Sequence, residues 1–264
     1  LRKEKYDMIV NLRPLVSVTA AIKMAFIFWI IGVKYKSGIE TGNLGFFYDI
    51  KVKEDIGGKK HEVKLYSELA KKIGFKTKND ISIKLDKKNI NFADKLFKKY
   101  KINKSDKIIV MNNESKWEAR KWDRNKYLKL IEVLSKRTRI RLIVNIFKDE
   151  GLINLIKSKH KNIIILGNGD IKNIAGVVSK ANVLITNDTG IMHIGAALNT
   201  PIIGIFGPTN PFLTGPYISR DKARIIYKKV DCSQCNNVKC NTMRCFKNIE
   251  VGDVIKAYKS LLKK

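Results

Sequence analysis

The chain has 264 residues, with 53 Lys or Arg against 24 Asp or Glu, and its formal net charge is +29. A hydrophobic share of 44% and a charged share of 29% are those of a globular protein, long enough for one large domain or two smaller ones. The four cysteines all lie within residues 232–245, which excludes the spread-out pattern of a secreted disulfide scaffold.

The positive charge allows more than one explanation. Lys is dispersed along the chain, and aromatic residues are not interleaved with it as they are in a nucleic-acid stacking platform. We therefore attribute most of the charge to drift in composition, since Lys, Ile and Asn are used heavily throughout. Attraction to an anionic substrate or to anionic lipid can add to that drift, and nucleic acid is not an expected partner.

The first hundred residues alternate between strand and helix patterns. A short apolar strand is predicted over 6–12, and a second short strand is predicted beyond residue 38. Apolar residues at helical spacing predict a helix over 61–75, which Gly74 closes. Another helix is predicted over 89–100, as the last of this part of the chain.

One apolar stretch, residues 15–33, could be mistaken for a membrane span. It is only just long enough, and Lys23 lies near its middle, where a charge is costly in hydrocarbon. We predict instead a helix that is buried beside a parallel sheet, or one that touches the membrane interface.

From residue 106 the pattern changes to repeated strand–helix units. The strands are continuous runs of Ile, Val and Leu, as expected for a parallel sheet that is covered by helices on both faces. The change in pattern predicts a boundary near residue 104, between domains 1–104 and 105–264. Strands are predicted over 107–113, 141–147, 162–168, 182–187 and 201–207, and helices over 126–134, 152–158, 171–181, 192–199 and 251–264.

The most informative segment is 185–217, where a buried strand runs through a tight turn into a helix. Such turns bind ligands because helix N-termini offer free N–H groups at the carboxyl ends of strands. Gly190 permits close approach to a phosphate, Thr189 adds a hydroxyl, and His193 follows one turn later. Taken singly, Asp188 could be only a helix cap and His193 only a buried imidazole. A second turn, Gly-Pro-Thr, follows the next strand and favours a site.

The run NDTGIMHIGAALNTPIIGIFGPTNPFLTGPY resembles the signature of glycosyltransferase family nine, which includes the ADP-heptose–lipopolysaccharide heptosyltransferases. IIVMNNESKWEARKWDRNKYLKLI is similar to the family's strand with small polar residues and a Lys-Trp pair, and IVNIFKDEGLINLI to its strand followed by an acidic residue. KYDMIVNLRPLVS resembles a strand near the middle of the family's N-terminal domain. The resemblance covers essentially the whole chain. Because the sequence begins at Leu1 and not at a Met, we expect a fragment whose natural start lies upstream.

The resemblance implies an α/β fold of the GT-B type, with two Rossmann-like domains that contain parallel sheets. The N-terminal one, incomplete here, would face the acceptor, and the C-terminal one would bind the donor nucleotide. Lys121 could contact phosphate or be an ordinary solvated lysine. The donor-binding residues implied are Asn112, Asn113 and Ser115 for an anion, Lys121 for phosphate, Glu150 for the ribose hydroxyls, and Asp188, Thr189, Gly190 and His193 for the diphosphate and sugar.

The implied reaction moves a heptose or a related sugar from an ADP-sugar to the lipopolysaccharide core, with inversion and without a required cofactor. Helix amides and a lysine can stabilise the leaving diphosphate. The sequence shows no Asp-x-Asp pair between apolar strands of the kind that binds a divalent ion, so transfer without a metal is favoured. The family's general base lies in a Gly-rich loop that has no match here, so the catalytic residue stays unknown. A cytoplasmic protein at the inner membrane, with a lipid-linked acceptor, is expected.

Two other functions are possible. A truncated relative could bind a nucleotide sugar without transferring it. A charge-driven nucleic-acid binder would leave the turn from Asp188 to His193 unexplained. The cysteines Cys232, Cys235, Cys240 and Cys245 have spacings that suit zinc or an iron–sulfur cluster, and similar clusters occur in the family. They could equally be reduced thiols in a loop, or pair under oxidation.

Overall fold

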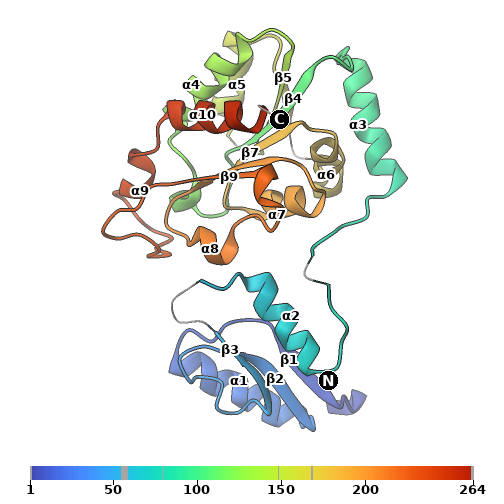
Figure 1. Ribbon diagram of the computed structural model, residues 1–264, viewed down its shortest axis with the longest axis vertical. Coiled ribbons are helices and arrows are strands. Elements are labelled where there is room, and N and C mark those ends of the chain that lie inside the picture. Colours follow the sequence, from blue (N-terminus) through green and yellow to red (C-terminus); the bar gives the residue numbers. More distant parts are fainter. Residues whose placement is uncertain (1, 55–58, 79, 148, 168, 263–264) are drawn as a thin grey trace. The chain divides into compact units, whose positions relative to one another are not determined.

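The computed structural model of the protein describes residues 2–54, 59–78, 80–147, 149–167 and 169–262. The chain divides into two compact units, Leu1–Asp80 and Ile81–Lys264. Each unit is built on a parallel sheet with helices packed against it (Figure 1).

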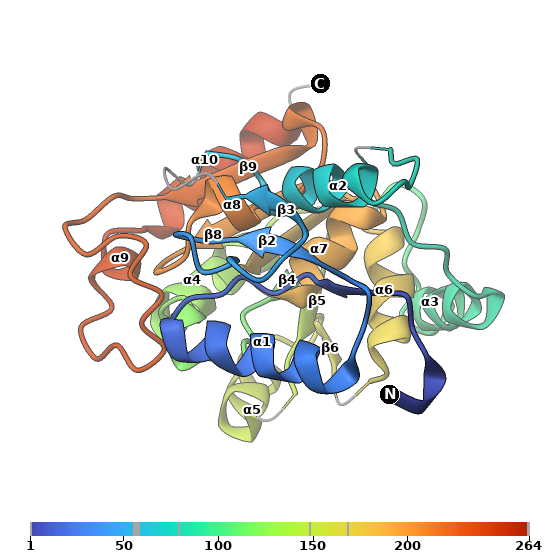
Figure 2. The same ribbon diagram turned by 90° about the horizontal axis from the view of Figure 1, so that it is seen from below.

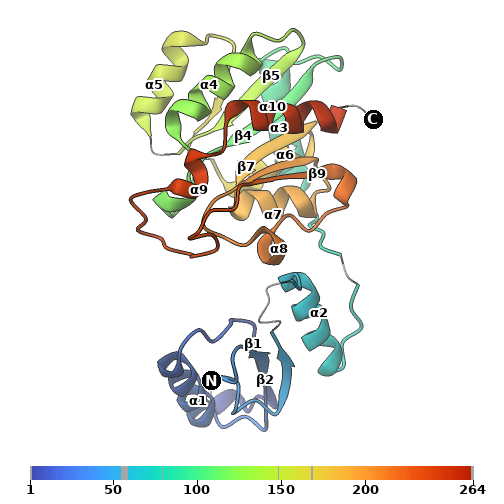
Figure 3. The ribbon, with the colours of Figure 1, turned by 60° about the vertical axis from the view of Figure 1, so that its left-hand side comes forward.

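The N-terminal unit is a three-stranded sheet between two helices. All strand pairings are parallel, and the order is β1 (Met8–Asn11), β2 (Tyr35–Glu40), β3 (Ile50–Lys53). Helix α1 (Val18–Ile31) and helix α2 (Glu62–Lys72) lie on opposite faces of this sheet (Figure 3). Two separate apolar clusters result, one beneath each helix.

Helix α1 forms where the sequence predicted a helix within 15–33. The Ser17 hydroxyl accepts a hydrogen bond from the Ala20 amide at 3.2 Å, and Gly32 ends the helix with a φ of 71°. Ala21 and Phe28 are buried on its inner side, so the helix packs beside a parallel sheet as predicted, but it is not a buried helix, because Val18, Ile22, Phe26, Ile27, Trp29 and Ile30 are exposed. In the described ranges, no helix is long and apolar enough to cross a membrane.

The C-terminal unit is a six-stranded, all-parallel sheet in the order β6-β5-β4-β7-β8-β9. Five of its strands were predicted, although the predicted strand over 162–168 is shorter in the structure and residue 168 lies outside the described part. The last strand, β9, was not predicted. The strands are β4 (Lys107–Asn112), β5 (Ile140–Asn145), β6 (Ile164–Leu166), β7 (Val183–Asn187), β8 (Ile202–Phe206) and β9 (Ala223–Tyr227).

Alternate side chains of each strand enter two cores. In β4, Ile109 and Met111 face one core, while Ile108 and Val110 face the other. The first core is covered by α4 (Arg124–Ser135), α5 (Glu150–Lys159) and α10 (Val251–Leu262), and the second by α3 (Lys87–Lys99), α6 (Ile171–Ser179) and α7 (Gly190–Ala197). Helix α10 matches the predicted helix over 251–264, except that residues 263 and 264 lie outside the described part.

The division between the units falls at residues 80 and 81, not near residue 104 as the sequence suggested. Helix α3 belongs to the C-terminal unit because it packs on α6. The contact is close: a Cβ built on Gly176 would lie 2.1 Å from the Asn89 carbonyl oxygen, and the Asn89 side chain donates to Asn173 Oδ1 at 2.9 Å. Glycine at position 176 is therefore what lets α3 approach.

Candidate functional site

The loops that follow β4 and β7 enclose the candidate site, at the carboxyl edge of the larger sheet. These strands are neighbours, and Asn112 of β4 lies opposite Thr186 of β7. Between the loops is a cavity of about 630 Å³. Its lining includes five of the predicted site residues: Asn112, Ser115, Lys121, Thr189 and Gly190.

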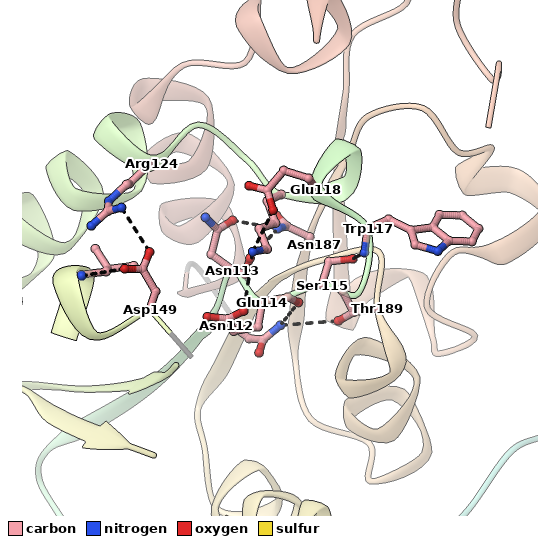
Figure 4. Close-up of polar contacts among 12 residues, drawn as sticks. Asn112, Asn113, Glu114, Ser115, Trp117, Glu118, Arg124, Asp149, Asn187 and Thr189 are labelled. Carbon is pink, nitrogen blue, oxygen red and sulfur yellow. Dashed lines mark hydrogen bonds and ion pairs between the residues drawn. The ribbon is translucent and has the colours of Figure 1, made fainter. Parts of the chain in front are cut away.

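Asparagine side chains join the ends of three strands beneath this cavity. The Asn145 amide at the end of β5 donates to Asn112 Oδ1 at 2.7 Å, and the Asn112 amide donates to Thr186 Oγ1 at 3.3 Å. The Asn112 amide also donates to Thr189 Oγ1 at 3.5 Å (Figure 4). All these residues except Thr189 are almost fully buried. Such a buried network fixes the cavity floor, because every broken bond leaves a polar group without water.

Asn113 plays a different part from the one predicted. Its Oδ1 accepts from the Asn187 amide at 2.7 Å and from the Trp122 backbone at 3.1 Å, and its own amide donates to the Trp122 carbonyl at 3.0 Å (Figure 4). These bonds hold the loop after β4 to the end of β7. Asn113 therefore shapes the site and does not line the larger cavity.

The turn into α7 presents backbone to the cavity. Thr189 is the residue before the first helical turn, and its hydroxyl makes no capping bond. Gly190 begins the helix, and a Cβ built there would meet nothing within 4 Å. Gly190 and Ile191 both line the cavity, so the N-terminal end of α7 faces open space, as an anion site requires.

Asp188 is not the helix cap, which was the alternative explanation for it. It is buried, and its carboxylate lies 3.6 Å from the Arg120 guanidinium and 4.0 Å from His193 Nε2. Arg120 also lies over the Trp117 ring, at 3.9 Å from the centroid. Burial lowers the pKa of His193, Asp188 opposes that shift, and Arg120 reinforces it. The arrangement links the loop after β4 to α7.

Lys121 lies in the wall of the cavity. Its ammonium group is 3.0 Å from Glu118 and 3.9 Å from Glu114. It also lines a second cavity of about 270 Å³, on the other side of the same loop. Lys121 therefore has the position that the prediction requires, and its contact with phosphate stays a prediction.

The structure does not bring Glu150 to either of these cavities. Glu150 is exposed in the first turn of α5, whereas Asp149, one residue earlier, lines the second cavity. Asp149 accepts a hydrogen bond from the Leu152 amide at 2.8 Å and pairs with Arg124 at 3.2 Å (Figure 4). The acidic residue after this strand thus acts first as a helix cap.

Asn145 was missed by the sequence analysis, although it lines both cavities. Its Oδ1 is buried and has no hydrogen-bond partner among the described residues. Buried polar atoms are rarely left unpaired, so this oxygen is an acceptor that a ligand can satisfy. The only sequence signal was a polar residue at the end of a buried strand. Arg120 gave no signal, because its role depends on the approach of Asp188.

The four cysteines have free thiols. Cys245 is buried in the short helix α9 (Arg244–Lys247), and burial raises the pKa of its thiol, with a smaller contribution from Cys240 and Cys232. The Thr242 hydroxyl lowers the pKa of Cys240. Within the part of the chain that the structure describes, no three His, Cys, Asp or Glu side chains are placed to hold a metal ion. The predicted metal site stays a prediction.

Two parallel sheets, each covered by helices on both faces, with a cavity at the strand ends of the larger one, define an α/β protein. A sequence model of glycosyltransferase family 9 (heptosyltransferase) matches residues 1–245, and the chain belongs to this family.

Lipooligosaccharide heptosyltransferase 2 of Campylobacter jejuni subsp. jejuni serotype O:2 is 27% identical over 197 residues, which cover 70% of this chain and 61% of that protein. A family 9 glycosyltransferase structure from Veillonella parvula DSM 2008 superposes with a TM-score of 0.74 at 20% identity, covering 100% of this chain and 77% of the other. Escherichia coli heptosyltransferase WaaC with ADP gives a TM-score of 0.66 at 18% identity, covering 98% and 75%. The expected α/β fold of the GT-B type is confirmed. The matched part of the chain spans less than two thirds of the length of each of three curated relatives, covering 32%, 34% and 61% of them.

Proposed function

We propose that the C-terminal unit binds the nucleotide-sugar donor of a glycosyltransferase that transfers a heptose, or a related sugar, from an ADP-sugar to the lipopolysaccharide core. The observation that carries this proposal is the open N-terminal end of α7 beside Lys121 and Thr189 in one cavity. Family membership and the ADP bound to a structural neighbour support the choice of donor.

The diphosphate would lie against the amides of Gly190 and Ile191. A helix N-terminus carries partial positive charge and unpaired N–H groups, so it stabilises phosphate oxygens without further ions. Lys121 would exchange Glu118 for a phosphate, because its ammonium group reaches the same cavity. Negative charge grows on the nucleoside diphosphate as the sugar leaves, and these groups would stabilise it. Transfer without a metal would be possible with these groups, and inversion is proposed from the family resemblance alone.

The nucleoside would occupy the apolar end of the cavity. Phe147, Ile171 and Ile194 line that end, and flat apolar surfaces suit a nucleobase. The unpaired Asn145 Oδ1 can accept a hydrogen bond from a ribose hydroxyl or an amino group. Asn145 is better placed for this contact than Glu150, which is exposed.

Asp188 would act through its neighbours. It holds Arg120 and His193 beside the turn, so that the sugar end of the donor meets a cationic guanidinium and an imidazole. The acceptor in this proposal is lipid-linked oligosaccharide, reached at the cytoplasmic face of the inner membrane. No general base is assigned to any residue of this chain.

The Lys121→Ala variant tests the proposal. Loss of one charge-assisted contact should weaken ADP binding by about 10- to 100-fold, from about 1.5–3 kcal/mol. Calorimetric titration with ADP measures it, with ADP-heptose and UDP-sugars compared in parallel. Lys157→Ala, an exposed lysine of α5 that lines neither cavity, is the matched control.

ADP affinity that is equal in the parent, Lys121→Ala and His193→Ala would remove the site assignment. Tight, Lys121-dependent binding of the ADP-sugar together with no transfer to an acceptor would favour the second candidate, a nucleotide-sugar-binding relative without activity.

A further inference from the structure

Helix α1 presents an apolar face to solvent in the N-terminal unit. Val18, Ile22, Phe26 and Trp29 follow one another at the spacing of helical turns, and they are 62%, 56%, 57% and 74% exposed. The Phe26 and Trp29 rings stack, with 5.9 Å between their centroids. Contiguous exposed apolar surface of this kind marks an interaction site in a globular protein.

Within the described part of the unit, α1 packs through its other side. The opposite side of α1 already buries Ala21 and Phe28, which pack with Leu15 and Tyr48. The helix is thus apolar on both sides, and in the described part of the unit its packed side is the one that faces the β1–β2–β3 sheet, which can be followed in Figure 2. An outer face that contributed only to solubility would carry polar residues instead.

The charges around α1 indicate the partner. Residues 8–39 contain no Asp or Glu, and their charges are Arg13, Lys23, Lys34 and Lys36. Arg13 precedes the helix and Lys34 follows it, and both are exposed. Only Lys36 has an acidic partner in the described part of the chain, Asp49 at 3.5 Å. An apolar strip with cations at its ends, the exposed Lys23 on the same helix and no carboxylates complements anionic headgroups above a hydrocarbon layer.

A second copy of this chain fits the face less well. Self-association through α1 would bring the same cations of both copies together, and like charges across an interface oppose binding. Trp29 is the most exposed residue of the strip, and Trp prefers the boundary between headgroups and acyl chains. The helix is about 21 Å long, from about 1.5 Å per residue, so it would lie on a bilayer and not cross it.

We infer that α1 docks the protein on a bilayer with anionic headgroups, with Val18, Ile22, Phe26 and Trp29 in the acyl boundary and Arg13 and Lys34 at headgroup phosphates. This inference stands apart from the donor site, because none of these residues belongs to the C-terminal unit. It assigns the membrane contact of the proposed function to one element.

Flotation with vesicles tests the inference. The 264-residue chain is mixed with phosphatidylglycerol–phosphatidylethanolamine vesicles or with phosphatidylcholine vesicles, and the bound fraction is measured. Binding should favour the anionic vesicles, and Trp emission should shift to the blue. Phe26→Glu should lower the partition coefficient by about tenfold or more, and Lys34→Gln by about fivefold. Phe75→Glu, which replaces an equally exposed Phe outside α1, should leave it unchanged.

Trp29→Ser, at the most exposed of the four apolar residues, provides a second variant outside the core. Far-UV circular dichroism and ADP titration on each variant separate a loss of fold, or a failure of the donor site, from a loss of lipid binding. The inference is overturned if the folded chain does not bind anionic vesicles, or if the Phe26→Glu and Phe75→Glu variants bind these vesicles equally well. It is also overturned if sedimentation shows a dimer that Phe26→Glu dissociates, without any vesicle binding.

Discussion

Asn112 and Asn113 are adjacent in the sequence at the end of β4, yet they have different structural roles. Both were predicted to meet an anion, because amides after a buried strand can donate to one. Both ends of each amide are used within the protein, but Asn112 lines the larger cavity and Asn113 does not. The difference depends on which side of the strand each faces and on where Asn187 lies. Neither is a local property of the sequence.

His193 carries a prediction about pH. Its pKa is lowered in the folded protein, chiefly by burial, so the unfolded chain binds the proton at a higher pH than the folded chain does. Stability must then fall as the pH drops below the ordinary His pKa of about 6.5. His193→Gln cannot take up that proton. Urea unfolding at pH of about 7.5 and about 5.5 should show a larger loss for the parent than for the variant, and equal losses would refute the assignment.

The contact between α3 and α6 shows what helix patterns leave undecided. The sequence predicted α3 as a helix correctly, but it placed the helix in the N-terminal domain. Helical spacing reveals an apolar face and does not say which surface covers it. Ala93 of α3 joins the core beneath α6, and Gly176 makes room for the Asn89 backbone. A glycine inside a helix was the one local sign of such an approach.

Gly176→Ala should therefore destabilise the protein. Its Cβ would clash with backbone atoms of Asn89, which cannot rotate away, so α3 must shift at a cost of about 1–3 kcal/mol. Gly252→Ala in α10 is the matched control, since a Cβ there meets nothing within 4 Å, and it should stabilise the helix by about 0.5–1 kcal/mol. Urea unfolding followed by circular dichroism compares the two. Equal effects would contradict the close packing of α3 on α6.

The strands of the larger sheet also differ in how well the sequence predicts them. Strands β4, β5, β7 and β8 were predicted because both of their faces are buried, which makes them continuous apolar runs. Strand β9 lies at the edge of the sheet, with Arg224 inside it and Ile225 exposed, so the run of Ile and Val is broken. The pairing with β8 therefore determines that residues 223–227 form a strand more than their own side chains do.

At the scale of the whole molecule, the fold class, the turn after β7 and part of the loop after β4 followed from the sequence, while the contribution of β5 to the cavity did not. The turn is encoded in one short segment. The cavity also needs Asn145 and Phe147 at the end of β5, which reach the turn after β7 only because parallel strands end at one edge. The net charge of +29 is likewise a property of the entire chain, and its local arrangement around α1 is more informative than its size.

A structure of the chain with ADP bound tests the central claim most directly. The account predicts that the diphosphate lies within hydrogen-bond distance of the Gly190 amide and the Thr189 hydroxyl, with Lys121 turned from Glu118 to a phosphate oxygen. A nucleotide bound elsewhere on the C-terminal unit, with the N-terminal end of α7 left to solvent, would contradict it.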